Sequence, residues 1–216
     1  MATLKSIALI SALISCLAQG QLMPAIHTSD SIYNRSYRIL DESKLFLEGT
    51  SNVNEFKCSC KEDFPVATFT FENSESNLTS VRFSDTRLTL KTRSLECGNR
   101  MMNKDLQKAL KAETFPNIVI QLSEASLRAN TFFPDQVLSG WTPMTAQTYI
   151  SIAGQTRKVR LDINVQKTGN DKYRFTASKE LHMTDFGIDP PTALLGLVKV
   201  NDRITINLDL TVALMD

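Results

Sequence analysis

The sequence predicts an all-β fold, in which an antiparallel sheet of about eight to ten strands closes into a barrel with one amphipathic helix. Three observations lead to this class. Apolar and polar residues alternate through most of the chain from residue 37 onward, as they do in strands with one buried face. Turn residues interrupt the alternation at short intervals, and only the segment at about 100–112 has helical spacing. A twisted sheet of this size tends to close, which also removes its exposed edges.

The first half of this region predicts four strands and then the helix. Met102, Leu106 and Leu110 recur at intervals of four, so they share one face of a helix of about 100–112. The helix is expected to end before Phe115-Pro116, because proline cannot continue a helix. The strands that precede it are expected at residues 43–50, 54–60, 66–72 and 81–93.

The second half predicts five more strands. The alternation is clearest in the odd positions of 159–165, which are all apolar and therefore share one face of a strand. Residues 182–197 are expected to form a loop with a short helical turn near 191–196. The periodicity leaves open whether the apolar faces cover a packed core or line a cavity. The strands are expected at residues 117–124, 145–152, 156–166, 172–181 and 202–212.

The first twenty residues have the pattern of a secretory signal peptide. Lys5 is followed by an apolar run at 7–17, and small residues stand at 18 and 20. The run is too short to span a bilayer. The expected organisation is a signal peptide at 1–20, a flexible leader at 21–36 and a single barrel domain at 37–216.

This pattern predicts a periplasmic or secreted protein. An alternative is a lipoprotein anchored through Cys16, because residues 13–16 also resemble a bacterial lipidation site. Removal of residues 1–20 takes away Lys5 and no acidic residue, so the formal charge falls from +1 to 0. A neutral chain argues against a nucleic-acid partner, which would require a basic patch. No transmembrane span is expected after the signal.

Three cysteines remain after the expected cleavage: Cys58, Cys60 and Cys97. In an oxidising compartment this count predicts one disulfide, which joins Cys97 to either Cys58 or Cys60. The two share one face of a strand, so the sequence does not choose between them. A metal site is the alternative, but only His27 and His182 exist to complete four-coordinate ligation. Neither a metal nor a cofactor is therefore expected.

Four segments in order resemble the YceI-like family of lipocalin-like barrels. The helix that runs into F-P-x-I and the D-F-G-I loop before the last strand carry most of this resemblance. It implies an extended barrel, exported to the periplasm, that carries a long isoprenoid or a similar apolar chain. The cysteines and a longer polar stretch near 130–141 depart from the family pattern. The matching segments are residues 97–122, 150–165, 175–188 and 197–210.

The predicted function is therefore the binding or carriage of an apolar lipid, held by burial of its chain at about 0.8 kcal/mol per methylene. The candidate ligand-binding residues are the apolar ones expected to face the interior, with two from the helix. They are Phe83, Leu88, Leu90, Met102, Leu106, Ile118, Ile120, Ile150, Ile152, Val159, Leu161, Ile163, Tyr173, Phe175, Phe186, Ile206 and Leu208.

The alternative function is a structural or interaction module with a filled barrel. Its sites would then be the loops at 130–141 and 182–196, because rigid scaffolds usually carry function on loops. Phe132, Phe133 and Trp141 are of the aromatic types that interfaces favour. A protein partner would bind there.

No enzyme is expected, because the sequence has no G-x-S-x-G, H-E-x-x-H or phosphate-loop motif. His182 stands close to Asp185 in the sequence and could form a His/Asp pair, but no nucleophile or oxyanion hole accompanies them, and a histidine at a strand end is more often a structural residue. In the D-F-G segment we expect Asp185 to bond the turn backbone, Gly187 to relieve the turn and Phe186 to plug one end of the interior.

Overall fold

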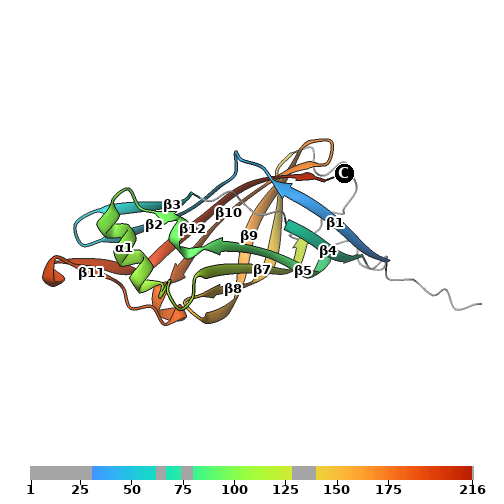
Figure 1. Cartoon of the computed structure of the whole chain (residues 1–216). Helices are drawn as coiled ribbons and strands as arrows, with labels where there is room; N and C mark the ends of the chain where they lie inside the picture. Colours follow the sequence, from blue (N-terminus) through green and yellow to red (C-terminus); the bar gives the residue numbers. More distant parts are fainter. Residues whose placement is uncertain (1–30, 62–66, 74–79, 128–139, 216) are drawn as a thin grey trace, which may run out of the picture.

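Antiparallel strands make up most of the fold, as the sequence predicts (Figure 1). The computed structural model describes residues 31–61, 67–73, 80–127 and 140–215. The strands are β1 (Ser31–Ile39), β2 (Lys44–Ser51), β3 (Glu55–Cys60), β4 (Ala67–Asn73), β5 (Ser80–Lys91), β6 (Leu95–Glu96), β7 (Asn117–Leu127), β8 (Thr142–Ile152), β9 (Gln155–Gly169), β10 (Lys172–His182), β11 (Thr192–Ala193) and β12 (Val198–Leu214).

The strands close into a barrel. Neighbouring strands follow the order β1-β4-β5-β7-β8-β9-β10-β12, and β12 pairs in turn with β1. All of these pairings are antiparallel. The antiparallel barrel predicted from the alternation is therefore confirmed. A further sheet, β2-β3-β6, extends from β12.

One edge of β12 has two partners in succession. From Val200 to Asp209 this edge pairs with β2, and from Val212 to Leu214 it pairs with β1. β10 pairs with β12 from Arg203 to Ala213, and the short strand β11 pairs with it at Val198 and Lys199. Figure 1 shows the result, because β2, β3 and α1 lie at one end of the molecule and β1 and β4 lie at the other.

The helix α1 spans Arg100–Ala109 and is slightly shorter than the predicted segment of about 100–112. Its first turn is capped by Asn99, whose side chain accepts the N–H of Met102. It ends early because Lys111 adopts a left-handed backbone and the N–H of Ala112 turns back to the carbonyl of Gln107. Among the described residues, three short 3₁₀ turns lie at Thr92–Ser94, Met183–Phe186 and Leu194–Gly196, the last within the turn predicted near 191–196.

Three strands differ from the sequence prediction. β1 begins at Ser31, inside the segment 21–36 that was expected to be a flexible leader. Its residues are mostly polar, and backbone pairing with β4 rather than an apolar pattern makes it a strand. β6 and β11 have two residues each, too few for any alternation to show.

The core is uneven along the barrel. The largest cluster of buried residues includes Leu90, Leu95, Ile150 and Phe186, and the helix packs its partly buried residues against it. Two much smaller clusters lie towards the other end, one around Met144 and Val165 on the β8-β9 side and one formed by Ile39 and Val212. The part of the barrel covered by α1 is therefore solidly packed, and we call it the packed half.

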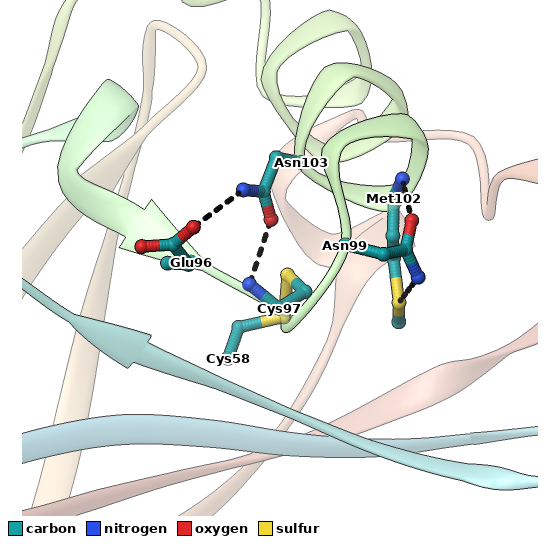
Figure 2. The surroundings of a disulfide bond; sticks show 6 residues. All are labelled: Cys58, Glu96, Cys97, Asn99, Met102 and Asn103. Carbon is teal, nitrogen blue, oxygen red and sulfur yellow. Dashed lines mark hydrogen bonds between the residues drawn. A yellow bond between two sulfur atoms is a disulfide. The ribbon is translucent and has the colours of Figure 1, made fainter.

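A disulfide joins Cys58 of β3 to Cys97, which stands between β6 and α1 (Figure 2). The side chain of Cys58 is wholly buried. Figure 2 also shows how the start of the helix is fixed to this bond, since Oδ1 of Asn103 accepts the N–H of Cys97 at 2.7 Å and its Nδ2 donates to Glu96 at 3.3 Å. The disulfide, β6 and the helix together seal the end of the packed half.

We expect the disulfide to contribute substantially to stability. It closes a segment with a sequence separation of 39, for which the chain-entropy model gives about 4 kcal/mol. Urea titrations of the oxidised protein and of the double variant Cys58→Ala/Cys97→Ala should differ by about this free energy of unfolding. Cys60→Ala is the matched control and should retain most of the stability. Equal midpoints for the oxidised wild type and the double variant would contradict the prediction.

Candidate ligand-binding cavity

The barrel interior holds an apolar cavity of about 330 Å³. This volume lies within the range of about 300–1,000 Å³ that is usual for small-molecule sites. Its wall is formed by residues of β1, β5, β7, β8, β9, β10 and β12, which are Tyr37, Ile39, Phe83, Thr86, Arg87, Leu88, Ile120, Leu122, Ala125, Met144, Ala146, Thr148, Leu161, Ile163, Val165, Tyr173, Phe175, Thr176, Ala177, Leu208, Leu210 and Val212.

The wall is apolar because matched rows of inward-facing residues cross the sheet. Leu161 lies opposite Ala146, and Ile163 lies opposite Met144, in the register of β8 and β9. Between them on the strand, Asp162 faces outward and is exposed. Directly paired residues share one face, so each row places its apolar side chains in the interior.

Small side chains explain why this part of the barrel is hollow. Ala125, Ala146 and Ala177 occupy inward positions on β7, β8 and β10 of the wall. In the packed half, the corresponding interior is filled by large residues such as Ile150, Leu181 and Phe186. A cavity remains where alanines replace residues of that size, because neighbouring backbone relaxes only partly into such a space.

The structure divides the seventeen residues predicted to contact a ligand into two groups. Eight of them line the cavity: Phe83, Leu88, Ile120, Leu161, Ile163, Tyr173, Phe175 and Leu208. The other nine lie in the packed half, in the main core cluster or against it: Leu90, Met102, Leu106, Ile118, Ile150, Ile152, Val159, Phe186 and Ile206.

This division follows the length of the strands. Residues on one face of a strand are separated by about 6.6 Å for each pair of positions, so a long strand passes through both halves. Val159 and Leu161 face the same way on β9 and both belong to the main core cluster, yet only Leu161 also lines the cavity. Alternation predicts the face of a residue but not its depth along the barrel. Sequence reasoning also missed the alanines, because small residues give no apolar signal, and it missed Tyr37, because no strand was expected at 31–39.

Two threonines face the cavity from adjacent parts of the wall. The hydroxyl of Thr148 donates to the carbonyl of Val159 at 2.9 Å. The Oγ1 atom of Thr86 is buried and has no hydrogen-bond partner among the described residues. The cavity therefore combines a large apolar surface with a polar atom that the protein leaves unpaired.

A larger hollow of about 880 Å³ lies on the exposed side of β2, β3 and β12. Charged side chains make up much of its lining, and some of them are paired, as in the contact of Lys57 with Glu48 at 3.4 Å. Solvated ion pairs of this kind contribute little energy, and a lining that mixes charged and apolar groups is less suited to a hydrocarbon chain. The smaller interior cavity is therefore the better candidate for an apolar ligand.

His182 has a different acidic partner from the predicted one. Its Nδ1 lies 3.1 Å from Oδ2 of Asp202 on β12. Asp202, not Asp185, also bonds the turn backbone, since it accepts the N–H of Thr184 at 2.9 Å and its hydroxyl at 2.8 Å. A carboxylate that accepts three hydrogen bonds positions the turn, so this pair has a structural explanation. Among the described residues, no three metal-ligating side chains gather as a metal site would require.

The D-F-G turn otherwise follows the prediction. Gly187 has a left-handed backbone with φ of 62° and ends the 3₁₀ turn. Phe186 is almost completely buried in the main core cluster. It therefore fills the packed half and does not line the cavity.

The two loops predicted to bind a partner differ in what the structure describes. Residues 130–139, with Phe132 and Phe133, lie outside the described residues. Trp141 is about half exposed, and the guanidinium of Arg174 lies 5.7 Å from its ring. In 182–196, Leu195 is fully exposed. No helix among the described residues has the length and hydrophobicity needed to cross a membrane.

Comparison with known proteins identifies related chains. The model of the YceI-like domain matches residues 49–212. BcnA from Burkholderia cenocepacia is 17% identical, with a TM-score of 0.55, and the match covers 78% of this chain and 95% of that one. A polyisoprenoid binding domain from Saccharophagus degradans, implicated in plant cell wall breakdown, is 11% identical, with a TM-score of 0.57 over 84% of this chain and 99% of that one. No curated protein matches the chain.

The contacts of Asp202 predict an effect of pH on stability. The N–H of Thr184, more than any other group, holds the pKa of this carboxyl below its usual value. A lowered pKa in the folded state means that the ionised carboxylate stabilises the fold above about pH 4, and that this contribution is lost as pH falls through the lower folded value.

We therefore expect Asp202→Asn to lower the midpoint of thermal unfolding at neutral pH. The difference from wild type should shrink as the pH falls through the lowered pKa of Asp202 in the folded protein, because its carboxyl then becomes protonated. Asp185→Asn in the same turn is the control and should leave the midpoint almost unchanged. A constant difference at all pH values would show that the charge of Asp202 does not contribute.

Proposed function

The chain belongs to the family of YceI-like domains, and from that premise we propose that it holds a chain lipid, an isoprenoid or a similar apolar molecule, inside its barrel. The protein acts as a binder or carrier and carries out no covalent chemistry. The single observation that supports this function is the apolar cavity in one part of a barrel whose other half is packed.

Burial of the chain supplies the affinity. Each methylene transferred from water into the cavity contributes about 0.8 kcal/mol, so ten of them contribute about 8 kcal/mol before the costs of association. Residues such as Leu161, Phe175 and Leu208 provide this apolar surface on three different strands. A ligand with a long chain is therefore held without strong polar contacts.

The nature of the chain is proposed from a relative. The Saccharophagus degradans domain is described as polyisoprenoid binding. It shares the fold with this chain at low sequence identity. A shared fold does not by itself establish a shared ligand, so an isoprenoid is our proposal for this chain. The methyl branches of an isoprenoid would suit a cavity whose wall mixes alanine with branched aliphatic residues.

We place this function outside the cytoplasm, in the periplasm or the extracellular space. The signal-like pattern of residues 1–20 and the disulfide between Cys58 and Cys97 both support export, since disulfides persist in oxidising compartments. A lipoprotein anchored through Cys16 would carry out the same binding at a membrane surface. The mass of the mature N-terminus distinguishes the two forms.

A second candidate function is protein recognition through 182–196. It is favoured by the exposure of Leu195 and of the adjoining Leu197, which is 74% exposed. Large exposed apolar side chains of this kind often mark contact surfaces. Substitution of these two leucines would then abolish binding of the partner, whereas substitutions in the cavity would leave it unchanged.

Filling the cavity tests the proposal. Ala146→Phe directs a ring into the space between β7, β8 and β9, and we expect the protein to remain folded because the cavity accommodates the ring. A ligand that loses two buried methylenes should bind about tenfold more weakly. Lipid uptake from an extract can be measured by mass spectrometry of the repurified protein.

The matched control is Gln147→Phe, which adds a phenylalanine at the next position of the same strand but on the outer face. It should bind lipid as the wild type does. Unchanged uptake by a folded Ala146→Phe variant would contradict a ligand site in this cavity. Loss of uptake in both variants would point to a general effect on the strand.

A further inference from the structure

Thr86 is the least explained polar residue of the cavity wall. Its side chain is only 6% exposed, and its hydroxyl oxygen has no hydrogen-bond partner among the described residues. Native proteins pair nearly all buried polar groups, and each exception requires an explanation. Valine has almost the same shape and would fill this position without an unpaired hydroxyl. The empty protein is therefore less stable with threonine here than it would be with valine.

The unpaired hydroxyl of Thr86 faces the cavity. Thr86 lies opposite Leu122 on β7, and Leu122 lies opposite Thr148 on β8, so the three form one inward-facing row. All three line the cavity, whereas Leu90 and Ile118, farther along the same two strands, pack in the core. Leu88 and Ile120, which pair with each other between this row and the core, also line the cavity. The row therefore lies near the inner end of the cavity, one step from the packed half.

The strand pairing is irregular beside Thr86 and Leu122. The pairing of β5 with β7 shifts between Arg82 and Thr86, and the pairing of β7 with β8 shifts between Leu122 and Glu124. Such bulges redirect side chains and occur preferentially beside binding sites. Here they adjoin the one row of the wall that carries two hydroxyl groups.

We propose that the ligand carries an uncharged oxygen group near the inner end of the cavity, where it forms a hydrogen bond with the hydroxyl of Thr86. This inference rests on the proposed function and refines it from any apolar chain to a chain with a polar group at a defined position. A hydroxyl both donates and accepts, so an alcohol, a carbonyl or an ether oxygen would suit it.

The polar group is uncharged because of its surroundings. Leu88, Ile120 and Leu122 adjoin Thr86 in the wall, and a charge placed among such residues without a counter-ion is strongly disfavoured. The hydroxyl of Thr148 already donates to a backbone carbonyl. Arg87 is charged and also borders the cavity, but it is exposed and leaves the strand from the face opposite to Thr86. The cavity beside Thr86 therefore fits a neutral oxygen group better than a phosphate or a carboxylate.

A matched pair of probes tests this contact. Farnesol and β-farnesene are fifteen-carbon isoprenoids that differ in the presence of a hydroxyl group. Dissociation constants of both can be measured by displacement of the apolar fluorophore N-phenyl-1-naphthylamine from wild type, Thr86→Val and Thr86→Ser. The quantity of interest is the ratio of the farnesol affinity to the farnesene affinity, because desolvation of the alcohol is common to all three proteins.

We expect Thr86→Val to lower this ratio about fivefold relative to wild type, the effect of one neutral hydrogen bond. Thr86→Ser keeps the hydroxyl and should retain the wild-type ratio. We also expect lipid-free Thr86→Val to melt at a higher temperature than lipid-free wild type, because the unpaired hydroxyl is gone. This melting experiment also shows that the variant is folded.

Two results would overturn the inference, and they differ in their bearing on the proposed function. If both probes bind wild type but Thr86→Val leaves the ratio unchanged, or if wild type binds farnesene and rejects farnesol, the Thr86 contact is wrong while the apolar cavity site stands. If wild type binds neither probe, the proposed function fails and this inference fails with it.

Discussion

The architecture depends on one constraint, which is that each edge of a strand can pair with a single neighbour at any point. The edge of β12 that does not face β10 pairs first with β2 and then with β1. At the change of partner the hydroxyl of Ser43 accepts the N–H of Thr211 at 2.9 Å and lies 3.2 Å from its carbonyl, to which it donates. This side chain continues the hydrogen bonding of the ladder where the backbone of the neighbouring strand turns away.

The change of partner produces two different interiors in one barrel. Where β2 is the neighbour, β3, β6, the disulfide and α1 add further layers, and large side chains fill the space between them. Towards the end where β1 is the neighbour, the sheet closes directly, and small inward residues such as Ala125 and Ala146 leave the interior open. The rigid half holds the wall of the cavity in place, so the open half need not collapse to be stable. A binding site that is preformed in this way loses little entropy when a ligand enters.

The sequence predicted the sheet well and the site only in part, for physical reasons that particular residues illustrate. Alternation identifies the inward face of β9, but Val159 and Leu161 lie at different depths, and no periodicity reports depth. The disulfide partner depended on β6, which has only two residues. Ser59 pairs with Glu96, so the next pair in this register brings Cys58 to Cys97, while Cys60 lies opposite Leu95. β1 was missed because backbone pairing with β4 makes it a strand, whereas its sequence has no alternation of apolar and polar residues.

Mass spectrometry of the protein purified from its natural source tests the central claim most directly. Under native conditions the account predicts a complex of one chain with one small molecule, and denaturation should release an apolar species with a long chain. A native mass equal to that of the protein alone, unchanged after incubation with a lipid extract from the same source, would contradict the account. The inward face of the barrel would then be ordinary core that is incompletely filled.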